Sequence, residues 1–345
     1  MIELNYNLVV MKIFKFLLFP FGILYFLVTY IRNKFYDFNL LKSISYKVPL
    51  IGIGNLSSGG TGKTPMVEYL IRHLSENYNT VLISRGYKRS TSGYVRATMN
   101  SSPNSIGDEP YQIFNKFKNI NTVVDSNRVR AVSKILTEEP KTELVVLDDC
   151  FQHRKINLKL NIILTTYHSP FYKDFIIPVG NLREKRSGYK RADIVVVTKC
   201  PDLISKNELD NIRKKIKLYN YQNLFFTKIS YNNNLKGDIQ INLDQIKQSI
   251  VLVTGIANSD PIANFLNKNG VDFKHISFSD HFNYSQHNID KIEKDNDKLI
   301  LTTEKDFQKI QLLKRKNKWV YLEIKIKFLE NESFFSSLVT KAVTS

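Results

Sequence analysis

The sequence contains few cysteines and few acidic residues, and it lacks a long apolar run. It holds two cysteines in 345 residues, Cys150 and Cys200, which is too few for a disulfide framework and shows no metal-ligand spacing. A reducing compartment is therefore expected. Asp and Glu number 32 against 50 Lys and Arg, a formal net charge of +18. This excess favours an anionic partner, such as a membrane surface, a phosphorylated substrate or nucleic acid, although scattered lysines also serve solubility.

The longest uncharged stretch lies near the N-terminus, over residues 16–30. It is shorter than the roughly 20 residues that span a bilayer, and Pro20 and Gly22 weaken a straight helix. No small-residue cleavage pattern follows it, which argues against a secretory signal. We expect residues 1–36 to form a membrane-associated helix that lies in the interface, with flanking cations on anionic headgroups. A buried core helix and a true span are the alternatives.

The most informative motif is a glycine-rich stretch, Ser-Ser-Gly-Gly-Thr-Gly-Lys-Thr. It follows the apolar run 48–54 and precedes the helical spacing of residues 65–74. Glycines let backbone N–H groups curl around an anion, and the helix points its positive dipole end at the same place. In such a loop the lysine reaches the β/γ-phosphates of a nucleotide, and the final hydroxyl ligates Mg²⁺. The expected phosphate-binding residues are Ser57, Ser58, Gly59, Gly60, Thr61, Gly62, Lys63 and Thr64.

Continuous apolar runs that alternate with helical stretches predict an α/β fold with a mostly parallel, doubly wound sheet. A polar, turn-rich stretch at 231–237 interrupts this pattern. We therefore expect a P-loop NTPase-like domain over residues 37–232 and a smaller α/β domain over 233–345. The predicted strands of the first are 48–54, 80–84, 121–125, 144–148, 160–165, 193–198 and 225–230, and those of the second are 249–254, 274–278, 299–302 and 320–324.

Charged residues follow two of the buried segments, where ligands of parallel sheets bind. Asp148 and Asp149 end an apolar strand and supply oxygen ligands for Mg²⁺, with a helix cap or turn as the alternative. Arg183 and Glu184 follow Gly180 and offer a guanidinium for phosphate and a carboxylate for a metal or ribose. Surface charge is the simpler explanation for that pair.

Asp108 and His281 are candidates for acid–base chemistry. Asp108 precedes Pro110, so a helix-capping role is an equal alternative. A lone histidine is more often structural than catalytic. A carboxylate–histidine pair drawn from the two expected domains would nevertheless make a base for a sugar hydroxyl.

These motifs together resemble the tetraacyldisaccharide 4'-kinases, membrane-associated enzymes that phosphorylate a lipid A precursor. That family carries a small hydroxyl residue at the position of Ser57, where other phosphate loops have glycine. Two departures stand out, because Cys150 replaces a usual glycine and Asn181 a small residue or proline. If Cys150 needs a positive φ, the turn after the metal aspartates is strained. The matching motifs are residues 54–65, 84–87, 107–110, 148–153, 180–184, 191–193, 280–281 and 303–306.

The resemblance implies a kinase that uses ATP and Mg²⁺ and phosphorylates the 4'-hydroxyl of a tetraacyldisaccharide 1-phosphate. Asp108 would be the base, paired with His281. The resemblance also implies a peripheral or monotopic protein on the cytoplasmic face of the inner membrane. We expect a monomer that binds no nucleic acid. The implied catalytic residues are Asp108, His281, Lys63 and Arg183, and the implied metal ligands are Thr64, Asp148, Asp149 and Glu184.

Two other interpretations stay open. A membrane-associated P-loop ATPase switch of the partition or septum-positioning type shares the Gly-Gly-Thr-Gly-Lys-Thr core. Such switches carry a second lysine near the start of the loop, where Ser57 and Ser58 stand here. A GTPase would use residues 198–202, Thr-Lys-Cys-Pro-Asp, for base recognition, but one residue too many separates the lysine from the aspartate.

Overall fold

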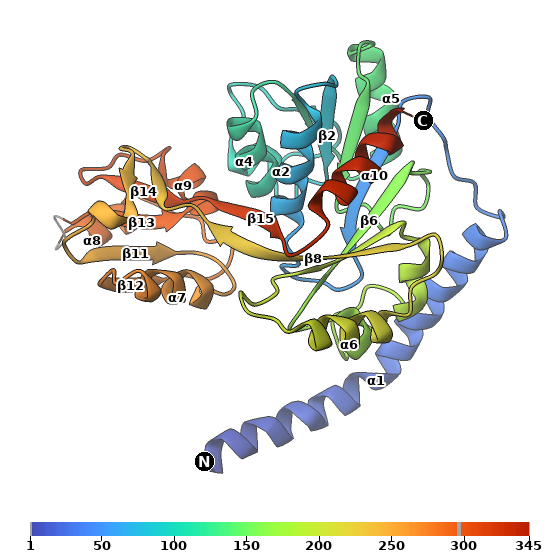
Figure 1. The fold of residues 1–345 in the computed structure, drawn as a ribbon, viewed down its shortest axis with the longest axis horizontal. Helices are drawn as coiled ribbons and strands as arrows, with labels where there is room; N and C mark the ends of the chain where they lie inside the picture. The colour runs from blue at the N-terminus through green and yellow to red at the C-terminus, as the bar shows by residue number, and fades with distance from the viewer. Residues whose placement is uncertain (1, 295–297, 345) are drawn as a thin grey trace. The chain divides into compact units, whose positions relative to one another are not determined.

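The computed structural model describes residues 2–294 and 298–344, with side chains from residue 18 onward. The chain clusters into two compact units (Figure 1). Unit 1 comprises residues 1–83, 128–228 and 327–345, and unit 2 comprises residues 84–127 and 229–326. Two strands, β8 (Asn223–Tyr231) and β15 (Ile324–Phe328), carry the chain from one unit to the other.

Unit 1 is built on a parallel sheet with strand order β8-β7-β6-β1-β5-β2. Every neighbouring pair in this series is parallel, which confirms the mostly parallel sheet expected from the apolar runs. All residues of β1, β2, β5 and β7 are buried, as strands covered on both faces should be. The strands are β1 (Leu50–Asn55), β2 (Thr80–Ser84), β5 (Leu144–Asp148), β6 (Leu160–Thr166) and β7 (Ile194–Thr198).

Helices cover both faces of this sheet. The apolar side of α6 (Lys206–Ile216) packs in one cluster with Phe226 of β8. The preceding side chain, Phe225, points to the opposite face because side chains alternate along a strand. There its ring centroid lies 5.1 Å from that of Phe335 in α10. The other helices of unit 1 are α1 (Ile2–Asp37), α2 (Lys63–Leu74), α5 (Arg128–Glu138), α10 (Glu332–Thr344) and the 3₁₀ turns Phe171–Lys173 and Arg186–Arg191.

Unit 2 contains a six-stranded sheet with order β10-β9-β14-β13-β11-β12. Its four strands from β14 to β12 pair in parallel, and β9 and β10 add an antiparallel edge. The strands are β3 (Val95–Arg96) and β4 (Asn121–Val124), an antiparallel pair, with β9 (Asn234–Gly237), β10 (Ile241–Asn242), β11 (Ile250–Thr254), β12 (Phe273–Ser277), β13 (Ile300–Thr303) and β14 (Trp319–Leu322). The helices are α3 (Pro103–Ile106), α4 (Asp108–Lys116), α7 (Asp260–Lys268), α8 (Gln286–Glu293), α9 (Glu304–Ile310) and the 3₁₀ turn Leu243–Gln245.

The units divide the chain differently from the expected boundary between residues 232 and 233. Residues 84–127 cluster with unit 2, where Lys116 of α4 forms ion pairs with Glu304 (2.9 Å) and Glu323 (2.8 Å). Residues 327–345 return to unit 1, where the Tyr69 hydroxyl of α2 donates to Glu332 (3.0 Å). Each tie joins residues distant in sequence, so local apolar patterns do not reveal it.

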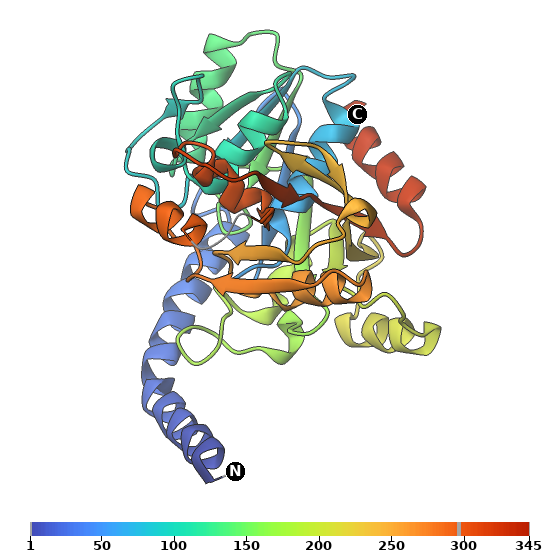
Figure 2. The same ribbon diagram turned by 90° about the vertical axis from the view of Figure 1, so that its left-hand side faces the viewer.

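The N-terminal helix α1 carries exposed apolar side chains. Both views show it as one long helix (Figures 1 and 2), and the side chains of residues 1–17 of the expected membrane helix lie outside the described part. Further along, Phe21 is 64% exposed, Leu24 62% and Val28 59%, so the alternative of a buried core helix is wrong for this stretch. Among the described helices, none is long and apolar enough to cross a membrane.

Candidate functional site

A glycine-rich loop joins β1 to α2 in unit 1. Gly59 (φ 103°) and Gly62 (φ 86°) take backbone conformations that L side chains rarely adopt. The Asn55 side chain, at the end of β1, donates to Thr61 Oγ1 (2.9 Å). Thr198, at the end of β7, donates its hydroxyl to the Thr61 carbonyl (2.8 Å). Two strand ends therefore hold the loop in place.

The first half of the loop is tied to the segment that carries Arg183. Ser57 bridges to Leu182, and the Ser58 N–H donates to the carbonyl of Asn181 (2.7 Å). Asn181 thus supports the loop through its backbone. Its departure from the family pattern leaves this contact intact.

An ion cluster lies beside the loop. Asp149 Oδ1 is 3.5 Å from Lys63 Nζ and 2.8 Å from Arg183 Nη1. Burial alone would raise the pKa of Asp149, but the charges of Lys63 and Arg183 outweigh it and hold that pKa below its ordinary value. Asp149 is therefore ionised at neutral pH. Thr64 follows Lys63 in the first turn of α2, and Asp148, the last residue of β5, is buried.

The turn after β5 holds its strain at Asp149. Asp149 has φ 47°, whereas Cys150 does not have a positive φ. The condition for strain at Cys150, a positive φ, is therefore not met, and the positive φ lies one residue earlier. Cys150 is buried, and burial raises the pKa of its thiol to about 12, so the thiol stays neutral. Arg128 fixes the same turn by donating from Nη2 to the Asp148 carbonyl (2.9 Å).

The carboxylate of Glu184 is engaged by protein donors. Oε2 accepts from the Asn33 side chain of α1 (2.8 Å), and Oε1 accepts from Arg191 (2.8 Å). Tyr25 of α1 donates to the Arg183 carbonyl (3.0 Å). Helix α1 is thus bonded directly to the segment that bears Arg183 and Glu184. Across the described part of the chain, no group of three or more His, Cys, Asp or Glu side chains is arranged to hold a metal ion.

Asp108 and His281 meet in unit 2. His281 Nδ1 lies 3.0 Å from Asp108 Oδ2, and Lys305 Nζ lies 3.1 Å from His281 Nε2. An ammonium group can only donate, so Nε2 accepts and Nδ1 carries the hydrogen donated to Asp108. Lys309 Nζ donates to the same Asp108 oxygen (3.2 Å). The site is a carboxylate with a histidine and two lysines around it.

The charge state of Asp108 follows from these contacts. Burial alone would raise its pKa, but the hydrogen bond from His281 and the charges of Lys309 and Lys305 lower that pKa below its ordinary value. Asp108 is a carboxylate at neutral pH. The pair was expected to come from two domains, yet both residues belong to unit 2 because residues 84–127 cluster there.

The sequence did not assign roles to the lysines around Asp108. Lys305 also pairs with Glu109 (3.1 Å), so it joins the histidine to a second carboxylate. Lys305 and Lys309 are four residues apart in α9 and therefore share one helix face. That spacing, next to a charged motif, is the signal that could have identified them.

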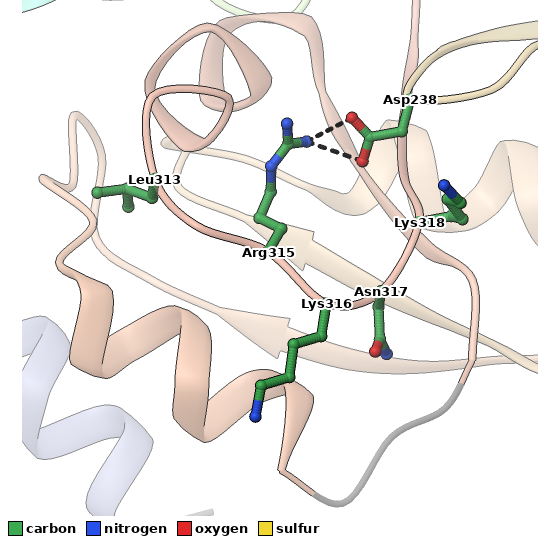
Figure 3. A pocket seen from close by; sticks show the side chains of 6 residues that line it. All are labelled: Asp238, Leu313, Arg315, Lys316, Asn317 and Lys318. Carbon is green, nitrogen blue, oxygen red and sulfur yellow. Dashed lines mark hydrogen bonds and ion pairs between the residues drawn. The ribbon is translucent and has the colours of Figure 1, made fainter.

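Two surface hollows lie elsewhere in the units. One, of about 520 Å³, lies between α1 and the segment 174–187 of unit 1 and is lined mainly by apolar side chains. The other, of about 340 Å³, lies in unit 2 (Figure 3). There Arg315 and Asp238 point toward one another, with Nη1 2.8 and 2.9 Å from the two carboxylate oxygens. None of the expected site residues lines the second hollow.

A parallel sheet with a glycine-rich loop between its first strand and helix, and a carboxylate that faces the loop lysine, is typical of α/β proteins that bind nucleotide phosphates. Comparison with known proteins narrows this class. The chain belongs to the tetraacyldisaccharide-1-P 4'-kinase family, whose family model matches residues 14–343. This membership replaces the interpretation as a partition-type switch.

Individual members of this family can be aligned with nearly the whole chain. The tetraacyldisaccharide 4'-kinase of Flavobacterium johnsoniae is 43% identical over 328 residues, 94% of this chain and 96% of that protein. The tetraacyldisaccharide 4'-kinase of Bacteroides thetaiotaomicron is 41% identical, covering 93% and 90% of the two chains. The fold is similar to a crystal structure of LpxK from Aquifex aeolicus in complex with ATP, with a TM-score of 0.79, 28% identity and coverage of 96% and 99%.

Proposed function

We propose that this protein transfers the γ-phosphate of ATP to the 4'-hydroxyl of a tetraacyldisaccharide 1-phosphate, a step of lipid A biosynthesis. The observation that carries the proposal is the Lys63–Asp149–Arg183 cluster beside the glycine-rich loop, in a chain of this kinase family. The ATP complex of the similar LpxK supports ATP as the donor.

The loop and its ion cluster would bind the nucleotide phosphates. Backbone N–H groups of the loop would cradle them, apart from those of Ser58 and Thr61, which donate to the Asn181 and Gly59 carbonyls. Lys63 and Arg183 would balance the negative charge on the terminal phosphate. Both cations now pair with Asp149, which preorganises them. Phosphoryl transfer depends mainly on such positioning and charge stabilisation.

Magnesium would be held by the Thr64 hydroxyl and the Asp149 carboxylate, with Asp148 supporting the turn. These are hard oxygen donors, and Mg²⁺ at nucleotide sites usually takes one or two carboxylates and completes its shell with phosphate and water. When bound there, the ion would supply positive charge that offsets the charge of the phosphate oxygens. We assign Glu184 to positioning, because Asn33 and Arg191 already occupy its two oxygens.

Asp108 would accept the proton of the attacking 4'-hydroxyl. All its ion pairs and hydrogen bonds with described side chains use Oδ2, so Oδ1 is the oxygen available to the acceptor. His281 holds the carboxylate in place through Nδ1–H, and Lys305 fixes the histidine tautomer. A positioned general base of this kind contributes about 10²- to 10⁴-fold to rate.

The lipid acceptor fits the surface around α1. The apolar hollow there is lined by Phe19, Phe26 and Val179 and also by Lys185, a combination that suits an acyl chain next to a phosphate. We propose that the apolar residues of α1 dock on the cytoplasmic face of the inner membrane as a peripheral or monotopic anchor. A monomeric state without nucleic-acid binding stays a prediction.

Membrane docking is tested by replacing two exposed apolar residues of α1. The double substitution Leu24→Ser and Val28→Ser removes apolar area from side chains that are 62% and 59% exposed. Binding to vesicles that contain phosphatidylglycerol is expected to weaken by about tenfold or more in a flotation assay. Leu203→Ser is the matched control, because Leu203 is 94% exposed but lies between β7 and α6. Equal loss in both variants would contradict the proposed docking face.

The activity itself is tested with the full chain, ATP, Mg²⁺ and the tetraacyldisaccharide 1-phosphate in mixed micelles. We expect formation of the 1,4'-bisphosphorylated lipid and an equal amount of ADP, detected by mass spectrometry. A reaction without the lipid acceptor measures background ATP hydrolysis. ADP release that does not depend on the lipid, with no bisphosphorylated product, would rule out the kinase assignment.

A further inference from the structure

The residue that follows β7, Lys199, has no role in the function proposed so far. It belongs to the stretch Thr198–Asp202, which sequence alone offers only as an imperfect base-recognition motif. Its backbone is left-handed, with φ 57°. A non-glycine residue keeps this conformation only where its surroundings hold it there, and such residues concentrate at ligand-binding sites.

The surroundings of Lys199 connect it to the glycine-rich loop. The preceding residue, Thr198, donates its hydroxyl to the Thr61 carbonyl inside that loop (2.8 Å). The following residue, Cys200, donates its N–H to the Thr227 carbonyl of β8 (3.0 Å). Between these two ties, Lys199 Nζ lies 3.7 Å from the place where a Cβ on Gly60 would stand. The ammonium group thus lies beside Gly60 of the loop.

Lys199 is also an uncompensated charge. In the described part of the chain, no carboxylate forms an ion pair with it, whereas Lys63 pairs with Asp149 (3.5 Å) and Lys228 with Asp202 (3.0 Å). Surrounding protein lowers the pKa of Lys199 by desolvation, although the residue keeps an exposed surface. Lys199 lies beside the proposed anion-binding loop and forms no ion pair with a described carboxylate. Its ammonium is therefore available to a bound ligand.

The strand order indicates which end of a nucleotide Lys199 faces. In the series β7-β6-β1-β5, the loop follows β1 and the ionised Asp149 follows β5. The terminal phosphate and its metal therefore belong to the β5 side of the loop. Lys199 approaches from β7, on the opposite side. That side remains for the nucleoside.

We propose that Lys199 forms the nucleoside end of the nucleotide site, with its aliphatic stem packed against the nucleobase and its ammonium beside Gly60. This inference rests on the proposed kinase function and adds a subsite to it. Recognition there is by packing, because the only carboxylate of the motif, Asp202, is engaged by Lys228 (3.0 Å). Lys199 is thus a positioning residue for the donor.

The test compares a nucleotide with a ligand that has phosphates and no base. Dissociation constants for ATP and for inorganic triphosphate, each with Mg²⁺, are measured by calorimetry on the full chain and on Lys199→Ala. We expect ATP to bind about tenfold more weakly to the variant and triphosphate to weaken less, by about two- to threefold, because triphosphate loses only the nearby charge whereas ATP also loses contact with the stem. Lys199→Met, which keeps an apolar stem, is expected to restore most of the ATP affinity.

Two controls give each outcome a meaning. Lys206→Ala removes another exposed lysine, at the start of α6, and thermal unfolding checks that each variant is folded. Equal weakening of ATP and triphosphate in Lys199→Ala would assign the residue to the phosphates and overturn the nucleoside-end proposal. An unchanged ATP affinity would overturn it as well. Failure of the unmodified chain to bind ATP would instead refute the proposed kinase function.

Discussion

Substitution of Asp108 by asparagine is expected to lower kcat by about 10²- to 10⁴-fold while the Kd for ATP changes by less than about twofold. Asparagine keeps the shape of the side chain and its place at the start of α4, but it cannot accept a proton from the 4'-hydroxyl. The Lys63–Asp149–Arg183 cluster belongs to unit 1 and Asp108 to unit 2. Turnover with the lipid acceptor and ATP calorimetry on the same preparation give the two quantities.

A neighbouring carboxylate provides the control for this prediction. Glu109→Gln removes a charge one residue away, where Glu109 pairs with Lys305 (3.1 Å), and should lower kcat by less than about tenfold. A comparable decrease in kcat for Asp108→Asn and Glu109→Gln would indicate that the negative charge at this place sets the rate, and that Asp108 is not the base.

The pH profile adds a second check on the base. The hydrogen bond from His281 favours the ionised form of Asp108 and so lowers its pKa. His281→Asn removes that donor while tolerating the left-handed backbone of residue 281 (φ 60°). The Asp108 pKa should then rise, and the acid limb of kcat/KM should move to higher pH. If the acid limb does not move, the group that titrates there is not Asp108.

The parallel sheet of unit 1 could be predicted because each strand carries its own signal. The run 144–148 is continuously apolar, as expected for a strand buried on both faces, and it forms β5. Helix α10 escaped prediction, since its burial depends on contact between Phe335 and Phe225, which are 110 residues apart in the chain. Local periodicity contains no information about such a partner.

The same limit applies to the candidate site. The place of the loop between a strand and a helix could be predicted, because the glycine-rich motif, the apolar run before it and the helical spacing after it lie within one short stretch. The pairing of Glu184 with Asn33 of α1 (2.8 Å) could not, and neither could the position of Lys199 beside Gly60. These contacts depend on strand order and on the path of a distant helix. Sequence motifs therefore name the candidate reacting groups, whereas the contacts that position these groups become visible only in the folded chain.

Substitution of Lys63 by alanine is expected to lower kcat by about 10²- to 10³-fold and to weaken ATP binding by about tenfold. Unlike Asp108, Lys63 would contact phosphate oxygens both before and during transfer, so both quantities should change. Lys159→Ala removes an exposed lysine next to β6 and should leave both within about twofold. If ATP binding weakens but kcat stays normal, Lys63 contributes to binding of ATP in the ground state and not to stabilisation of the transition state.

The Lys63 variant should also change the acid stability of unit 1. The pKa of Asp149 is lowered in the folded protein, so this carboxylate contributes stability that is present above its unfolded pKa and is lost as the pH falls through the folded value. Removal of Lys63 leaves Arg183 as the ion-pair partner at 2.8 Å, and the folded pKa should rise toward the unfolded one. The unfolded pKa of an aspartate is about 4, so urea unfolding at pH 7 and at about pH 3 should show a smaller pH dependence for Lys63→Ala than for the unmodified chain. An unchanged dependence would mean that Arg183 alone holds the Asp149 charge.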